Sequence, residues 1–188
     1  MNITRVSLEG LLLIDPLCFQ DERGFFLETY QSDRYRAAGI VEQFVQENQS
    51  RSARGVLRGL HFQVQRPQAQ IVTVVRGRVF DVAVDLRASS PTFGQWFGVE
   101  LSDEGPRQLY MGPGFAHGFC VLSDWADLHY KTSRFYDPHD EGGLLWSDPE
   151  VGIQWPIETP QMASRDMAYP RIRDLSQLQL PQPHLLER

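Results

Sequence analysis

The chain has 188 residues, 41% of them hydrophobic and 22% charged, and its formal net charge at pH 7 is −6. These values fit one globular domain, residues 1–188, with enough apolar side chains for a packed core. The acidic balance argues against general nucleic-acid binding, and no apolar run approaches the roughly 18–20 residues of a membrane span.

The N-terminal residues and the cysteines bear on the cellular compartment. Met1 to Leu13 lacks a basic region followed by an apolar stretch and a cleavage site, so we expect no secretory signal. Cys18 and Cys120 lie far apart and form no CxxC pair. We therefore expect reduced thiols, a cytoplasmic protein and no zinc site.

The first predicted elements are a strand and a short helix. Phe25–Thr29 is rich in strand-forming residues. Ser32 can cap a helix over Asp33–Ala38, and Gly39 can end it.

A hairpin is predicted in the middle of the chain. Ile71–Val75 and Val79–Leu86 are rich in β-branched residues and flank a possible turn at Arg76–Arg78. Asp81 and Asp85 fall on one face of the second run, which predicts a strand with one wetter face.

Short strands continue toward the C-terminus, separated by glycine and proline. The candidates are Trp96–Leu101, Phe115–Leu122 and Leu128–Thr132. A short helix is predicted around Leu175 and Leu178, before Pro181 and Pro183. Many short strands at such spacing predict an all-β fold, namely a sandwich, jelly roll or barrel.

His61 is the sharpest candidate for chemistry. It follows Arg58-Gly59-Leu60, where glycine allows a ligand to approach the backbone, and histidine exchanges protons near neutral pH. The competing interpretation is a histidine satisfied within a strand, which is stronger still for His117. Spacing alone does not bring His61 and Asp166 together.

A metal-dependent jelly roll is the interpretation that the histidines disfavour. Such proteins usually carry two histidines one residue apart, a carboxylate and a later histidine. His61 has no histidine two residues before or after it, and only His117 resembles the later ligand. We therefore expect no catalytic metal, and no metal-dependent oxygenase.

Several motifs, taken in order and spacing, resemble the dTDP-4-dehydrorhamnose 3,5-epimerase (RmlC) family. They are Asp-x-Arg-Gly-x-Phe at 21–26, Gln-x-Asn-x-Ser-x-Ser at 46–52, Gly-Val-x-Arg-Gly-Leu-His at 55–61, Ser-Pro-Thr-Phe-Gly at 90–94, Phe-Ala-His-Gly-Phe at 115–119 and Trp-x-Asp-Pro at 146–149.

The resemblance implies a cupin-type β jelly roll with a few short helices, acting as a homodimer without metal or cofactor. The implied reaction inverts a nucleotide-linked 4-keto-6-deoxy sugar, such as dTDP-4-keto-6-deoxyglucose, at carbons next to its ketone. His61 would be the base, oriented by Asp166, and Tyr130 the acid. The implied substrate-binding residues are Arg23, Phe26, Glu28, Gln46, Asn48, Arg58, Gln70, His117, Tyr136, Glu141 and Arg165.

Two positions depart from the family pattern. Gln70 and Arg165 stand where the family usually has lysines; Arg165 keeps the charge and Gln70 does not. Two alternatives stay open: an epimerase acting at only C3 or only C5, and a non-catalytic jelly roll that binds sugar nucleotides. The presence of His61, Tyr130 and Asp166 together argues against the second.

Overall fold

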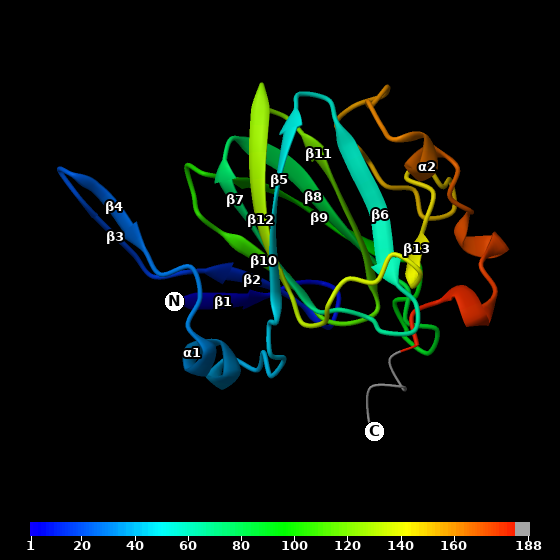
Figure 1. The fold of residues 1–188 in the computed structure, drawn as a ribbon, viewed down its shortest axis with the longest axis horizontal. Helices are drawn as coiled ribbons and strands as arrows, with labels where there is room; N and C mark the ends of the chain where they lie inside the picture. Colours follow the sequence, from blue (N-terminus) through cyan, green and yellow to red (C-terminus); the bar gives the residue numbers. More distant parts are fainter. Residues whose placement is uncertain (183–188) are drawn as a thin grey trace.

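Two antiparallel sheets form the body of the computed structural model, which describes residues 1–182 (Figure 1). In spatial order, the larger sheet comprises β1 (Asn2–Arg5), β2 (Leu11–Asp15), β10 (Gln108–Met111), β7 (Gln70–Arg76), β12 (Trp125–Thr132) and β5 (Gln46–Ala53). The second sheet comprises β13 (Glu141–Gly143), β6 (Leu57–Gln63), β11 (Phe115–Val121), β8 (Arg78–Asp85) and β9 (Trp96–Ser102). This arrangement confirms the all-β prediction and the cupin-type jelly roll.

The main core lies between the sheets. Alternate residues of β7 and β12, such as Val72, Val74 and Leu128, pack against Ala83 of β8 and Phe119 of β11. Side chains alternate between the two faces of a strand, so every second residue points into the space between the sheets. Where the apolar core ends, these inward residues are polar.

The outer face of the second sheet is covered by the C-terminal part of the chain. Leu144, Val151 and Leu180 pack against the outward side chains of β6 and β8. Both faces of β8 are therefore buried, and the prediction of one wetter face was wrong. Asp81 and Asp85 are 0% exposed, and hydrogen bonds offset the cost of burying them: Asp81 binds His117, and Asp85 binds Arg87, Ser90 and Thr92.

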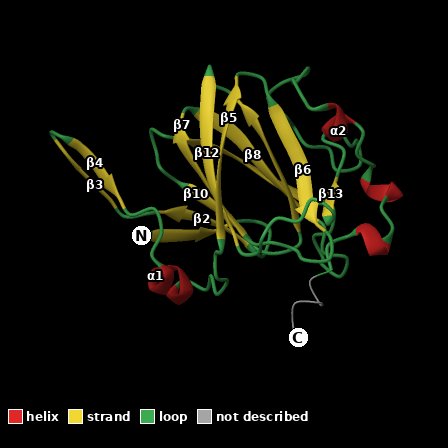
Figure 2. Cartoon of the chain, in the orientation of Figure 1, coloured by secondary structure: helices red, strands yellow, loops and turns green. Residues whose placement is uncertain are grey.

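The helices are short and lie at the edges of the sheets (Figure 2). Helix α1 (Ser32–Ala37) begins one residue before its predicted start, and the cap is Gln31 rather than Ser32. The Gln31 side chain accepts a hydrogen bond from the Arg34 N–H at 2.6 Å. Gly39 follows the helix with a positive φ of 94°, in agreement with its predicted terminating role.

The tail departs from its prediction. No α-helix forms around Leu175 and Leu178; two short 3₁₀ helices at Ile172–Asp174 and Gln177–Gln179 take its place. Ile172 and Leu175 pack against the covered face of the sheet, whereas Leu178 is 80% exposed, so the segment has no continuous apolar stripe that would favour an α-helix. Pro183 lies outside the described residues. A further helix, α2 (Ser164–Met167), packs beside β6.

A two-stranded hairpin extends away from the sheets (Figure 1). It consists of β3 (Cys18–Asp21) and β4 (Gly24–Leu27), so the strand predicted at Phe25–Thr29 ends two residues early. None of the helices within residues 1–182 combines the length and the apolar character that a bilayer crossing requires.

Candidate active site

A polar pocket of about 320 Å³ lies between the two sheets. It begins where the inward residues of β12 change from Ala126 and Leu128, in the core, to Tyr130 and Thr132. Ten of the predicted site residues line it: Gln46, Asn48, Arg58, His61, Gln70, His117, Tyr130, Tyr136, Glu141 and Arg165.

A bulge in β6 brings Arg58 and His61 into the same pocket. In a regular strand, residues three apart face opposite sides. Between their pairs with β11, β6 contains one more residue than its partner, which restores the common face. Gly59 has φ of +115°, and a Cβ there would lie 2.6 Å from the His117 carbonyl oxygen and from Gly118 Cα. Only glycine fits this position.

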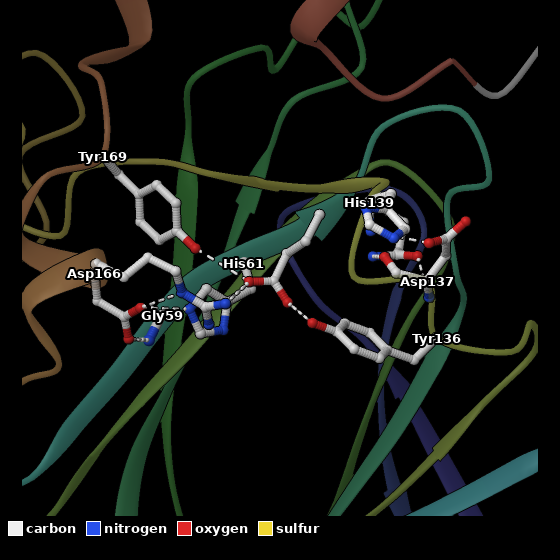
Figure 3. Close-up of polar contacts among 10 residues, drawn as sticks. Gly59, His61, Tyr136, Asp137, His139, Asp166 and Tyr169 are labelled. Carbon is white, nitrogen blue, oxygen red and sulfur yellow. Dashed lines mark hydrogen bonds and ion pairs between the residues drawn. The ribbon is translucent and has the colours of Figure 1, made fainter.

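His61 is held by a buried carboxylate. Its Nε2 lies 2.9 Å from Asp166 Oδ1, and the Gly59 N–H donates to the other oxygen at 3.2 Å (Figure 3). Burial alone would raise the pKa of Asp166, but the hydrogen bond and charge of His61, the Gly59 N–H and Arg165 together lower it. An ionised Asp166 accepts the Nε2 hydrogen, so the lone pair of the neutral ring is on Nδ1.

His117 forms a second histidine–aspartate pair beside the first. It lies directly opposite His61 in the register of β6 and β11, so both side chains face the pocket. Its Nε2 lies 3.0 Å from both carboxylate oxygens of Asp81, which is fully buried.

Tyr130 contributes a phenol from the larger sheet, opposite the strands that bear the histidines. Burial raises its pKa, although the positive charge of Arg58 lowers it in part. Tyr130 therefore keeps its proton at neutral pH. Arg58 is oriented by Ser52, whose hydroxyl accepts a hydrogen bond from Arg58 Nε at 2.9 Å.

Strand β5 supplies a polar wall. The Gln46 side-chain Nε2 donates to Asn48 Oδ1 at 3.0 Å. The Oε1 of the same Gln46 side chain accepts from the Tyr136 N–H at 3.0 Å. Ser50 also lines the pocket, and its hydroxyl is the single buried side-chain oxygen or nitrogen within residues 1–182 that has no hydrogen-bond partner.

Glu141 connects three side chains beside His61. It accepts hydrogen bonds from the hydroxyls of Tyr136 at 2.6 Å and Tyr169 at 3.2 Å, and it forms an ion pair with Arg165 at 2.7 Å. Figure 3 shows both hydroxyls pointing toward the region next to His61. The Tyr169 ring packs edge-on against the imidazole, with ring centres 5.7 Å apart.

Three predicted residues lie outside this pocket. Arg23 and Phe26 are on the projecting hairpin, where Phe26 is 69% exposed and Arg23 pairs with Asp21. Glu28 pairs with Arg34 of α1. The fold thus separates these three residues from the other eleven, and their predicted roles are not tested by this arrangement.

Some residues of the site were missed by sequence reasoning. Asp81 carried a usable signal, because a charged residue inside an otherwise apolar strand often has a buried partner. Ser50 carried one too, because it alternates with Gln46 and Asn48 in the motif at 46–52 and so shares their face of the strand. Tyr169 carried none, since its placement depends on how distant segments pack. Residues 1–182 contain no group of three His, Cys, Asp or Glu side chains arranged to hold a metal ion.

Comparison with known proteins places these observations in a family. The family model described as dTDP-4-dehydrorhamnose 3,5-epimerase matches residues 5–174. The enzyme of that name from Shigella flexneri is 49% identical over 89% of this chain and 93% of the relative. A dTDP-4-dehydrorhamnose 3-epimerase from Streptomyces niveus is 46% identical over 88% of this chain and 81% of the relative.

A solved structure is similar over nearly the whole fold. It is dTDP-6-deoxy-D-glucose-3,5-epimerase RmlC from Legionella pneumophila Philadelphia 1, in complex with dTDP-4-keto-L-rhamnose. It is 47% identical to this chain, with a TM-score of 0.93, and the match covers 96% of this chain and 97% of the other.

Proposed function

The chain belongs to the dTDP-4-dehydrorhamnose 3,5-epimerase family, and we propose that it inverts a dTDP-linked 4-keto-6-deoxy sugar at C3, C5 or both. The observation that carries this proposal is the His61–Asp166 pair, which shares a polar pocket with the protonated phenol of Tyr130. A base and an acid on opposite walls are what inversion of a carbon next to a ketone requires.

The reaction follows from the acidity of that carbon. His61 Nδ1 removes the proton, and the bonding electron pair moves toward the ketone oxygen to form an enolate. The ionised Asp166 stabilises the imidazolium that results, as a carboxylate does in hydrolase triads. Tyr130 then delivers its proton to the opposite face of the carbon, which inverts the centre. The imidazolium of His61 releases its proton to solvent, and solvent restores the phenol. The substrate already contains the ketone, so the steps need no redox cofactor.

Substrate binding is assigned to the rest of the polar lining. Arg58 and His117 would hold the sugar and diphosphate, with Gln46 and Asn48 on the nucleotide sugar. Tyr136 would contact the sugar or base from the loop after β12. Arg58 brings positive charge to this pocket and offsets the overall acidity of the chain there, which suits an anionic ligand.

A homodimer is part of the proposal. The hairpin carries exposed Phe19, Phe25 and Phe26, at 62%, 67% and 69%, together with Arg23. Clustered aromatic side chains are rarely left in water without a binding role. Arg23, Phe26 and Glu28 would complete the nucleotide site of a second copy. A cytoplasmic location also belongs to the proposal, supported by the unpaired Cys18 and Cys120.

Inversion at a single carbon is the second candidate. The similar Streptomyces niveus enzyme is a 3-epimerase, and Gln70 stands where the family usually places a lysine. The Gln70 amide can donate a hydrogen bond to the enolate oxygen, but it brings no positive charge.

The test is incubation with dTDP-4-keto-6-deoxyglucose in D₂O, followed by NMR. We expect deuterium at C3, C5 or both, accompanied by inversion. His61→Ala should reduce exchange by about 10²–10⁴-fold, the usual contribution of a general base. Tyr130→Phe should retain exchange and lose most inversion, because the proton can still return to the original face.

Three outcomes would contradict the assignments. Near-normal exchange in His61→Ala would remove His61 as the base. Unimpaired inversion in Tyr130→Phe would mean that another group is the acid. A wild-type protein that binds the sugar nucleotide but incorporates no deuterium would favour the non-catalytic alternative.

A further inference from the structure

Glu141 differs from the other pocket residues in how completely the protein occupies its carboxylate. Its side chain is only 10% exposed. One oxygen accepts from Tyr136, and the other accepts from Arg165 and Tyr169, at distances of 2.6, 2.7 and 3.2 Å. A carboxylate satisfied in this way is poorly placed to bind the hydroxyls of a sugar.

The three donors come from two segments of the chain, and Figure 3 shows Tyr169 and Tyr136 on either side of His61. Tyr136 belongs to the loop after β12, whereas Arg165 and Tyr169 flank Asp166 in and after α2. Helix α2 has only four residues, too few to be stable alone, so its position depends on contacts with the sheets. Glu141 provides such a contact from β13, which pairs with β6 next to His61.

The same contacts set the charge around the imidazole. The ionisable groups that surround His61 are Asp166, Arg165 and Tyr169 from the α2 segment, Glu141 from β13, Arg58 from β6, His117 from β11 and Tyr130 from β12. Arg165 lies between two carboxylates, 2.7 Å from Glu141 and 3.5 Å from Asp166. Without Glu141, the positive charge of the Arg165 guanidinium would act on the His61–Asp166 pair alone.

We propose that Glu141 is a positioning residue for the base: it fixes Arg165 and Tyr169 around the His61–Asp166 pair and balances the charge of Arg165. Glu141 touches no reacting atom. Its pairing with Arg165 also keeps an unbalanced negative charge away from an anionic substrate. The inference rests on the proposed role of His61 as base.

The decisive experiment compares Glu141→Gln with Arg165→Gln. The pH dependence of kcat/KM should show an acid limb, because only a neutral His61 can accept the proton. Glu141→Gln removes negative charge, which disfavours the imidazolium, so the limb should move to lower pH by about 0.5–1 unit. Arg165→Gln removes positive charge and should move the limb to higher pH. The double variant should return close to the wild-type limb.

The kinetic constants separate positioning from substrate binding. Glu141→Gln keeps the size of the side chain, and we expect kcat to fall by about 10- to 100-fold, as for a misplaced catalytic group. KM should change by less than about threefold. The matched control is Glu100→Gln, which makes the same change at an exposed ion pair with Arg78 and should leave both constants unchanged.

Several results would overturn the inference. One is a rise in KM with normal kcat, which would make Glu141 a substrate ligand. Another is an acid limb that stays in place, or that moves the same way in both variants. Circular dichroism shows whether Glu141→Gln folds. If it does not, Arg165→Gln still tests the charge balance, because an acid limb that fails to move to higher pH in that variant contradicts it. Failure of the proposed function is distinct: wild-type protein would then show no deuterium exchange at all.

Discussion

The two histidines of the pocket share a construction and differ in access. Each imidazole forms a hydrogen bond through its Nε2 with a buried aspartate, Asp166 for His61 and Asp81 for His117. The side chain of His61 is 31% exposed and that of His117 is 14% exposed. The more accessible ring is the one assigned as the base, and the more enclosed ring is suited to holding the substrate.

Ser50 gives the first prediction at the scale of single residues. Its buried hydroxyl has no hydrogen-bond partner, so removing that group from water on folding lowers the stability of the protein with no bond to compensate. We expect a substrate hydroxyl to supply the missing bond. Ser50→Ala should raise KM by roughly 2- to 12-fold, the equivalent of about 0.5–1.5 kcal/mol, without lowering Tm.

Ser52→Ala is the matched control on the same strand. The Ser52 hydroxyl already accepts from Arg58, so its removal breaks an existing bond and should lower Tm. If Ser50→Ala lowers Tm and leaves KM unchanged, the Ser50 hydroxyl serves the fold and not the substrate.

Gln70 carries the second prediction. A lysine at this position would stabilise the enolate oxygen by a charge-assisted hydrogen bond, stronger than that of an amide by about 1–2 kcal/mol. Gln70→Lys should therefore increase deuterium exchange at C3 or C5 by roughly 5- to 30-fold. Exchange at the two carbons is measured separately by NMR.

Gln68→Lys adds the same charge elsewhere on the pocket lining and should give no such increase. If a folded Gln70→Lys variant shows unchanged or reduced exchange at both carbons, Gln70 does not take the place of the lysine. The reason for expecting inversion at a single carbon would then disappear.

At the scale of elements, the bulge in β6 determines which side chains meet. It turns Arg58 and His61 to the same face and brings the Gly59 N–H to Asp166. Gly59→Ala should lower the free energy of unfolding by at least about 2 kcal/mol, because alanine is strained at this φ and its Cβ would overlap the backbone of β11. Equilibrium denaturation measures this loss.

Gly39→Ala separates the two causes. Its φ is also positive, at +94°, but an added Cβ would meet nothing within 4 Å. It should lose only the conformational part, about 1 kcal/mol. Equal losses in the two variants would mean that the close approach of β6 to β11 contributes nothing.

What the sequence could predict follows from how local each feature is. The strands rest on local alternation, and Ile71–Val75 falls within β7 (Gln70–Arg76). The wetter face assigned to Asp81 failed because that face, which also carries Val79 and Ala83, turns toward the larger sheet, and a single strand does not reveal which sheet will pack on it. The contact between His61 and Asp166 spans 105 positions, so only family resemblance, and no spacing rule, could anticipate it.

At the scale of the whole molecule, the hairpin raises the question of which pocket it serves. Ten predicted site residues line one pocket, whereas Arg23 and Phe26 lie on a hairpin that projects away from the sheets (Figure 1). In a two-fold symmetric dimer, each hairpin can reach the pocket of the other copy. We expect the protein to be a dimer by light scattering, and an active monomer at assay concentration would contradict this.

Mixing two inactive variants shows whose pocket the hairpin completes. His61→Ala lacks the base, and the double variant Arg23→Ala/Phe26→Ala lacks the hairpin contacts. In a mixed dimer, the pocket with an intact His61 receives the intact hairpin of the other copy. Random pairing makes half of the dimers mixed, each with one working pocket of two, so co-expression should restore about one quarter of wild-type activity. If each hairpin instead completes the pocket of its own subunit, no working pocket forms in any pairing of the two variants. Co-expressed protein that is no more active than the separate variants would therefore exclude sharing of the hairpin between subunits.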